Sequence, residues 1–136
     1  SRDASSSGYI TTLLGRKCRF DKWEEAVYNP GVLKVPMSHA EAEKKYGGES
    51  IRRAFTYKAL NKLIQGSAAD MTKQAMLDLY NEGIVPHIQI HDELDISVES
   101  PEQVKKIIEI MENAVKLNIP NKVDYEEGNN WGEIYD

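Results

Sequence analysis

The sequence predicts an α+β fold, in which helices pack on one face of an antiparallel sheet. Short segments that alternate apolar and polar residues, typical of half-buried strands, flank Gly15 and the stretch at residues 91–93. Two longer segments, from about residue 51 to 81 and from 101 to 115, repeat apolar residues at helical spacing. The 136 residues, 40% of them hydrophobic, suffice for one core, and we expect a single domain over residues 1–136.

The first part of the chain is expected to form a hairpin. Residues 9–14 and 17–20 read as two short strands joined at Gly15, because glycine favours tight turns. The polar residues 1–7 have the composition of a disordered or frayed end, or of an artificial addition. Cys18 is the only cysteine, so an internal disulfide is excluded.

Helices are expected in the middle of the chain. Ser38 with Glu41 three residues later is a capping-box pattern, which starts a short helix that Gly47 ends. A long helix then covers about residues 51–81, with a weak point at Phe55 where it bends or divides.

The remainder of the chain is expected to form a second hairpin, another helix and one more strand. Residues 86–90 and 94–98 read as strands joined by a tight connection. Ser100 followed by Pro101 is a typical helix start, with a cap and then a proline at the first helical position. Residues 122–126 read as a last strand.

The second hairpin carries two adjacent acids, Asp92 and Glu93, in its connection. A strand core does not tolerate two neighbouring carboxylates, because an unpaired charge is costly to bury. Carboxylates that project from a rigid two-stranded ribbon can hold divalent cations for phosphoryl chemistry. The alternative is an ordinary polar turn, since Asp is common in turns.

The long helix has a polar and an apolar face. Tyr57, Asn61 and Gln65 stand four residues apart and form a line on one face, which is either a binding surface or a solvated stripe. Gly66 costs the helix roughly 1 kcal/mol relative to Ala, which indicates a close approach by another group. The apolar face, expected to be buried, consists of Leu60, Leu63, Ile64, Ala68, Met71, Ala75 and Leu79.

Four segments resemble, in order, the motifs of one enzyme family. They are residues 8–16 (Gly-Tyr-Ile-Thr-Thr-Leu-Leu-Gly-Arg), 65–70 (Gln-Gly-Ser-Ala-Ala-Asp), 89–94 (Gln-Ile-His-Asp-Glu-Leu) and 128–131 (Gly-Asn-Asn-Trp). With them the chain resembles the C-terminal part of family A DNA polymerases, the bacterial polymerase I type with its phage and organelle relatives. The resemblance implies the palm, with part of the fingers, of a DNA-directed DNA polymerase.

The resemblance also implies roles for the acidic hairpin. Asp92 and Glu93 would be catalytic: Asp92 matches the family's metal-binding carboxylate, and Glu93 matches the neighbouring acid that supports the primer end or the metal shell. Transfer of a nucleotide from a dNTP to a primer 3′-OH uses two Mg²⁺ ions roughly 3.5–4 Å apart in the complete enzyme. Gln89 either orients these groups or is an ordinary outward strand residue.

Contacts with primer-template DNA are implied as well. Asn61, Gln65 and His91 would donate to the minor groove, whose purine N3 and pyrimidine O2 acceptors occur at all four base pairs. Such donors test base-pair geometry without reading sequence. The alternative for His91 is a hydrogen bond to the neighbouring acids.

Charge is distributed unevenly within the net charge of −5. Residues 1–90 contain 13 basic and 10 acidic side chains, whereas residues 91–136 contain 4 and 12. This distribution is compatible with a DNA-facing side and a separate acidic metal site, although surface charge also serves solvation. The basic residues expected to contact DNA are Arg16, Arg53 and Lys58.

The chain departs from the family's pattern at two positions. Tyr57 stands where the bacterial enzymes usually carry Arg, so the family's minor-groove contact is not expected from Tyr57, and Lys58 is the neighbour that could supply the charge. Asp95 stands where the family is generally apolar, and its charge would raise the pKa of its neighbours.

Parts of the family's active site match nothing in this chain. The second essential carboxylate and the fingers helix that holds the nucleotide would lie upstream of Ser1, and Asp70 is expected to interact within its own helix. We therefore expect three partners, which are primer-template DNA, dNTP and an upstream polymerase segment, and no activity from the isolated fragment. No membrane span is expected, and the location would be the cytoplasm, or the host cytoplasm for a phage protein.

Two other functions remain open from the residues. One is a non-catalytic DNA-binding module with a vestigial acidic hairpin. The other is a metal-dependent nuclease, which would need more ligands around Asp92 than Glu93, Asp95 and His91 provide.

Overall fold

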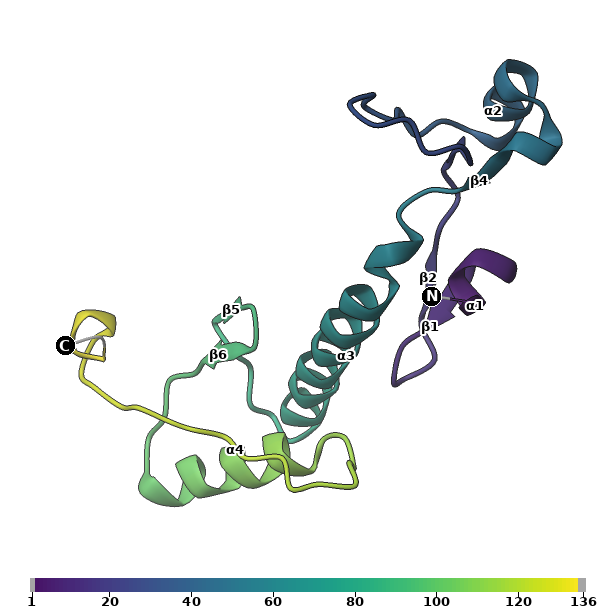
Figure 1. Cartoon of the computed structure of the whole chain (residues 1–136). Coiled ribbons are helices and arrows are strands. Elements are labelled where there is room, and N and C mark those ends of the chain that lie inside the picture. The colour runs from purple at the N-terminus through teal and green to yellow at the C-terminus, as the bar shows by residue number, and fades with distance from the viewer. Residues whose placement is uncertain (1, 135–136) are drawn as a thin grey trace. The chain divides into compact units, whose positions relative to one another are not determined.

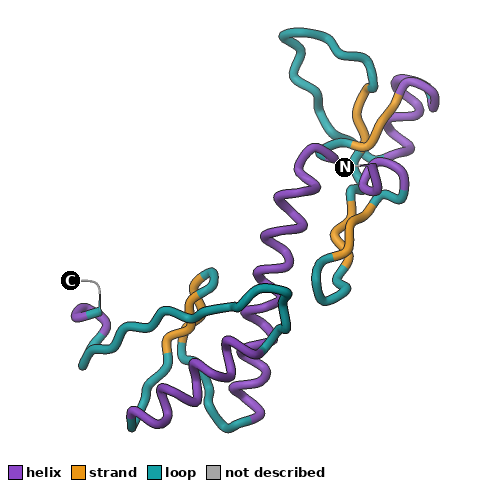
Figure 2. Tube along the Cα trace, turned by 60° about the horizontal axis from the view of Figure 1, so that its bottom comes forward, coloured by secondary structure: helices purple, strands orange, loops and turns teal. Residues whose placement is uncertain are grey.

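The computed structural model describes residues 2–134 and has the α+β architecture that the sequence predicts. It divides into two compact units, Ser1–Asp70 and Met71–Asp136, and the long helix α3 (Ala59–Asn81) crosses the boundary between them (Figure 1). The strands pair as three two-stranded antiparallel sheets, drawn in orange in Figure 2. Among the described residues, no helix is long and apolar enough to cross a membrane.

The first unit begins with a helix. α1 (Arg2–Ser6) buries Ala4 completely in a small core with Phe20 and Ala59. The expectation of a disordered or frayed end is therefore wrong for residues 2–6, because the core holds this segment in place; Ser1 lies outside the described residues.

The first hairpin is confirmed with shorter strands than predicted. β1 (Tyr9–Thr11) pairs antiparallel with β2 (Lys17–Arg19). Gly15 lies in the connection with φ of 87°, a conformation that glycine adopts without steric cost. The backbone N–H of Thr12 donates to the carbonyl of Arg16 at 2.9 Å, which closes the loop.

α2 (His39–Tyr46) begins and ends where the sequence predicts. Ser38 Oγ accepts from the backbone N–H of Glu41, and the Glu41 carboxylate accepts from the backbone N–H of Ser38, so the capping box is complete. Gly47 ends the helix with φ of 84°.

The long helix begins later than predicted. Ile51–Arg53 is strand β4, which pairs antiparallel with β3 (Trp23–Glu25) and is thereby removed from the helix. Phe55 has φ of 63°, and the short 3-10 turn η2 (Thr56–Lys58) then leads into α3. The chain changes direction at Phe55, but the bend or division within one long helix is wrong, because a strand and not a helix precedes this point.

The second unit contains the other hairpin and α4 (Pro101–Asn113). α4 begins as predicted, because Ser100 Oγ accepts from the backbone N–H of Gln103. The buried core consists of Leu79, Ile84 and Ile107, with Leu94, Ile96, Ile110 and Met111 packed against it.

The predicted strand at residues 122–126 is wrong. This segment has no regular structure, and the backbone N–H of Val123 donates to the carboxylate of Glu112 at 3.1 Å instead. A strand needs a neighbour with free backbone groups, and in the described part of the chain none pairs with this segment. The 3-10 turn η3 (Trp131–Glu133) follows.

Candidate functional site

The two adjacent acids lie at the end of the second hairpin. β5 (Ile88–Ile90) pairs antiparallel with β6 (Glu93–Asp95), and Ile90 faces Glu93 as the last pair before the connection. The connection is therefore His91 and Asp92 alone, and Glu93 is the first residue of β6. Both connecting residues are exposed.

The backbone of this connection has an uncommon conformation. His91 has φ of 55°, in the left-handed region where His is one of the few enriched non-glycine residues. Gln89 Nε2 donates to the carbonyl of His91, so the strand residue supports the connection that presents Asp92. This bond agrees with the orienting role considered for Gln89.

The apolar core of the second unit holds the hairpin in place. Leu94, in the middle of β6, packs against the core formed by α3 and α4, and the neighbours Glu93 and Asp95 point to the opposite side of the strand. Burial raises the pKa of Asp95, and the charge of Glu93 and a hydrogen bond with it act in the same direction. Asp95 thus lies on the same side of the strand as Glu93, in surroundings that disfavour its charged form.

The two carboxylates at the end of the hairpin are oxygen donors of the kind that Mg²⁺ prefers. Among the described residues, no group of three or more His, Cys, Asp or Glu side chains is placed to hold a metal ion. Mg²⁺ is commonly held by one or two protein carboxylates, with water and substrate phosphates as the other ligands. Asp92, exposed on a supported connection, fits such a role with Glu93 beside it.

A second candidate surface lies along the start of α3. Tyr57, Lys58, Asn61, Lys62 and Gln65 line a cavity of about 430 Å³. All five are exposed, and the Lys58 ammonium lies over the rings of Phe55 and Tyr57 at 5.1 and 5.7 Å. The structure thus brings three of the residues expected to bind DNA, Lys58, Asn61 and Gln65, to one surface of the first unit.

Arg16, also expected to bind DNA, is bonded to another side of α3. Its Nε donates to Asp70 Oδ1 at 2.8 Å, and its Nη2 donates to the carbonyl of Gly66 at 2.9 Å. The backbone N–H of Leu13 donates to Ser67 Oγ at 3.0 Å. The connection between β1 and β2 is therefore bonded to three positions of the helix.

Asp70 is buried at this contact, with 5% of its surface exposed. A hydrogen bond with Thr12 is the largest influence that lowers its pKa, and the adjacent Arg16 lowers it further. The expectation that Asp70 interacts within its own helix is wrong, because its carboxylate bonds to a residue of the hairpin 54 positions away in sequence.

Gly66 confirms the close approach that its place in the helix indicates. A Cβ atom at this position would lie 2.8 Å from Cγ2 of Thr12, well inside van der Waals contact. Glycine therefore allows the hairpin connection to reach the helix backbone, where the carbonyl of Gly66 accepts from Arg16.

The Arg53 side chain is also bonded within the protein. Its Nη1 donates to the carbonyl of Phe20 at 3.0 Å, and its guanidinium lies 4.6 Å from the ring centroid of Trp23. A Cβ added at Gly8 would meet the same guanidinium at 2.6 Å. The side chain expected to contact DNA is thus packed beneath the first hairpin.

The expected buried face of α3 is only half correct. Leu60 and Ile64 are 65% and 59% exposed, whereas Ala75 and Leu79 are buried. In the first unit the hairpin contacts the side of the helix that carries Gly66 and Asp70, so the apolar stripe there is left uncovered. The later part of the stripe is buried because the second unit has its core at that end of α3.

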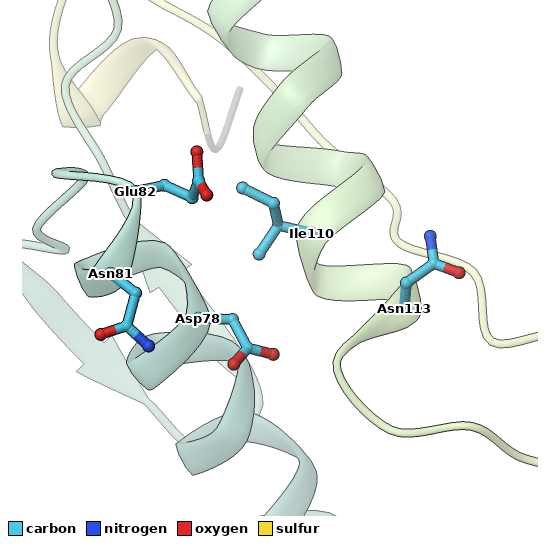
Figure 3. Close-up of a pocket in the computed structure, with 5 residues that line it drawn as sticks. All are labelled: Asp78, Asn81, Glu82, Ile110 and Asn113. Atoms are coloured by element: carbon cyan, nitrogen blue, oxygen red, sulfur yellow. The ribbon is translucent and has the colours of Figure 1, made fainter.

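A further cavity of about 360 Å³ lies in the second unit, between the end of α3 and α4 (Figure 3). Three of its polar lining residues are already paired: Asp78 accepts from Gln74, Glu82 forms an ion pair with Lys106, and Asn113 donates to a backbone carbonyl of its own helix. We therefore assign no function to it.

Sequence reasoning missed the contact between Arg16 and Asp70. Arg16 is the last residue of segment 8–16, and Asp70 is the last residue of segment 65–70. The helical glycine Gly66, four residues before Asp70, already indicates that another segment approaches the helix on this side. Considering the two motifs as packing partners would have found it.

Comparison with known proteins confirms the resemblance. The model of DNA polymerase family A matches residues 1–133. A DNA-directed DNA polymerase of Pseudomonas phage M6 is 37% identical over 129 residues, which cover 95% of this chain and 16% of that protein. DNA polymerase I of Bacillus caldotenax is 33% identical over 139 residues, covering 96% of this chain and 14% of the relative. The thermostable DNA polymerase I of Thermus filiformis is 37% identical over 138 residues, with the same two coverages.

The chain therefore spans 14–16% of the length of these three relatives. Each of the four motif segments falls within the matched residues. The chain belongs to DNA polymerase family A.

Proposed function

We propose that this chain is the C-terminal palm portion of a DNA-directed DNA polymerase, which adds a nucleotide from a dNTP to the 3′-OH of a primer. One observation carries the proposal. Asp92 is exposed in a two-residue connection, on a hairpin that Leu94 holds against the core. A carboxylate presented in this way can bind a cation without being drawn out of a buried pair.

Asp92 is the residue that would hold Mg²⁺, and Glu93 beside it would support the metal's water shell or the primer end. Two such ions, when bound, stabilise the attacking and the leaving oxygen of the transfer. The protein's part is to keep the carboxylate in place, which the bond from Gln89 to the backbone of His91 supports.

The exposed surface along the start of α3 would meet the primer-template. Asn61 and Gln65 are one helical turn apart and carry amide donors, so they can address successive minor-groove acceptors. Lys58 lines the same cavity and would place a positive charge near a phosphate, in the region where Tyr57 offers none.

A complete site would need protein groups beyond those described. The resemblance to the family and the 14–16% coverage of the relatives support an upstream polymerase segment as the partner. That segment would supply the second catalytic carboxylate and the helix that binds the incoming dNTP.

Primer extension separates this proposal from its alternatives. With Mg²⁺, dNTPs and primer-template, the 136-residue chain alone should extend nothing, and the chain joined to its upstream segment should extend the primer. Extension by the chain alone would overturn the incomplete-site proposal. DNA binding without extension by the joined protein would favour a non-catalytic module, and metal-dependent shortening of the primer by the chain alone would favour a nuclease.

A further inference from the structure

We infer that Arg16 and Asp70 form a clasp that sets the rotation of α3 about its own axis, so that Arg16 is a positioning residue for the DNA-facing side chains and not a phosphate contact. The clasp comprises Thr12, Arg16, Gly66, Ser67 and Asp70. Its consequence for DNA rests on the proposed function, whereas the clasp itself is measurable on the protein alone.

Several bonds of different kinds converge in the clasp. The Arg16 side chain donates to a carboxylate and to a backbone carbonyl of the helix, at 2.8 and 2.9 Å. The neighbouring backbone N–H of Leu13 donates to Ser67 Oγ. Because the acceptors lie at positions 66, 67 and 70, they occupy one side of the helix over about one turn. Hydrogen bonds to several successive residues on one side of a helix resist rotation of the helix about its axis.

The ion pair between Arg16 and Asp70 differs from a surface ion pair, because one of its two partners is buried. The side chain of Asp70 is 6% exposed and that of Arg16 is 50% exposed, so the arginine covers a carboxylate that has little access to water. If Arg16 moved to a DNA phosphate, it would leave that carboxylate without its ion pair in a buried place, which is costly. The same guanidinium would also lose the carbonyl of Gly66.

The DNA-facing residues are directly coupled to this rotation. Gln65 precedes Gly66 in the helix, and Asn61 lies one turn before Gln65, so both are rigidly related to the clasp through the helix backbone. A side-chain tip lies about 6 Å from a helix axis, so a rotation of roughly 10° displaces it by about 1 Å. A misplacement of about 1 Å costs on the order of 100-fold in rate.

The first test measures the salt dependence of primer-template binding by the complete polymerase. A phosphate contact contributes a slope of about 0.9 in log affinity against log salt. Arg16→Gln should leave the slope of the wild type unchanged, while Lys58→Gln, on the exposed surface, should reduce it by about 0.9. A reduction of that size with Arg16→Gln would overturn the inference.

The second test uses a primer that lacks the minor-groove acceptor at its terminal base. The wild type should be slowed by this analogue, and both Arg16→Gln and Asp70→Asn should be nearly indifferent to it while extending an ordinary primer roughly 10- to 100-fold more slowly. A loss of folded protein would lower the rate on both primers equally. Retained sensitivity to the analogue in both variants would overturn the positioning role.

A third measurement needs no DNA. Arg16→Gln and Asp70→Asn should each lower the Tm of the 136-residue chain, and the double variant should lower it no further than the more damaging single variant, because both remove one interaction. Arg19→Gln is the control, an exposed basic residue of the same hairpin. Additive losses of Tm would overturn the clasp.

The tests also separate the clasp from the proposed function. If the wild-type polymerase extends the analogue as fast as the ordinary primer, the minor-groove proposal fails, and the Tm comparison alone decides whether the clasp exists.

Discussion

Ile90 and Glu93 face each other across hairpin β5–β6 as the last paired residues of their strands. The pairing leaves a two-residue connection, and Asp92 has no freedom to slide along the strand. A one-residue shift of register would exchange the two faces of the hairpin and expose Leu94. The position of the proposed metal ligand is therefore coupled to the packing of the partly buried Leu94 against the core of the second unit.

Asp92→Asn tests the proposed metal ligand in the complete polymerase. The change keeps the shape of the side chain but removes its charge, so the rate of nucleotide transfer should fall at least ~10³-fold. Primer-template affinity should change little, because removing a negative charge beside phosphate does not weaken binding. Single-turnover extension measures the effect, with Glu99→Gln as an exposed control outside the hairpin. Near-normal turnover of Asp92→Asn would make Asp92 an ordinary turn residue.

Gln65→Ala tests the proposed minor-groove contact. Gln65 is exposed and no described contact depends on its amide, so the free energy of unfolding should change by less than about 0.5 kcal/mol. Extension should nevertheless slow, because the primer end would lose one of the bonds that position it.

The discriminating measurement compares an ordinary primer with one whose terminal pair lacks the minor-groove acceptor. The wild type should respond to the difference and Gln65→Ala should not. Lys73→Ala, at an exposed position further along α3, serves as the control. An equal response in wild type and Gln65→Ala would assign Gln65 to a solvated stripe.

Gly66→Ala tests the close approach of the first hairpin to α3. Alanine favours helix by roughly 1 kcal/mol, but its Cβ would meet Cγ2 of Thr12 at 2.8 Å. We expect a net loss of about 1–2 kcal/mol in the free energy of unfolding, since overpacking typically costs more than the gain in propensity.

Thr12→Ser removes the clashing methyl group and keeps the hydroxyl. The double variant with Gly66→Ala and Thr12→Ser should therefore be more stable than Gly66→Ala alone, as measured by denaturant unfolding. A double variant no more stable than Gly66→Ala would place the cause of the loss elsewhere.

Asp95→Asn tests the charge that accumulates on one side of β6. Burial and the neighbouring Glu93 raise the pKa of Asp95 in the folded state, so the ionised form opposes folding. The free energy of unfolding of the wild type should therefore fall as the pH rises from the unfolded pKa of Asp through the raised folded pKa, because the folded protein gives up the proton less readily than the unfolded chain.

Asparagine does not ionise, so the variant should not show this pH-dependent decrease in the free energy of unfolding. Asp95→Asn should thus be more stable than the wild type at neutral pH, and the difference should shrink as the pH falls below the unfolded pKa. Chemical unfolding of the 136-residue chain between acid and neutral pH measures this, with Asp21→Asn as an exposed control. A stability difference independent of pH would exclude the titration of Asp95 as its cause.

The elements that the sequence predicts well depend on neighbours within a turn or two. The capping box of Ser38 and Glu41 begins α2 as expected, and Ser100 with Pro101 begins α4. The alternation on either side of residues 91–93 predicts a tight hairpin connection, and Asp92 lies in it with Glu93 as the next residue. Each signal is local, because the groups that satisfy the backbone lie only a few residues away.

The errors concern segments whose structure depends on distant partners. Ile51–Arg53 has a helical pattern but pairs with Trp23–Glu25, and residues 122–126 have a strand-like pattern but find no described strand. Leu60 and Ile64 lie on the apolar stripe and remain exposed, because the hairpin contacts another side of α3.

The sequence by itself determined the family, the α+β class and the acidic connection of the second hairpin, because these depend on residue order and on short-range backbone chemistry. Only the tertiary structure decided which of the basic residues expected to contact DNA are bonded within the protein. Arg16 and Arg53 look like Lys58 in the sequence, yet the guanidinium groups of the first two donate hydrogen bonds within the first unit, whereas the Lys58 ammonium lies over two aromatic rings on an exposed surface. The reason is physical: an arginine pairs with the acceptor that folding brings to it, and neither Asp70 nor the carbonyl of Phe20 is a neighbour of its arginine along the chain.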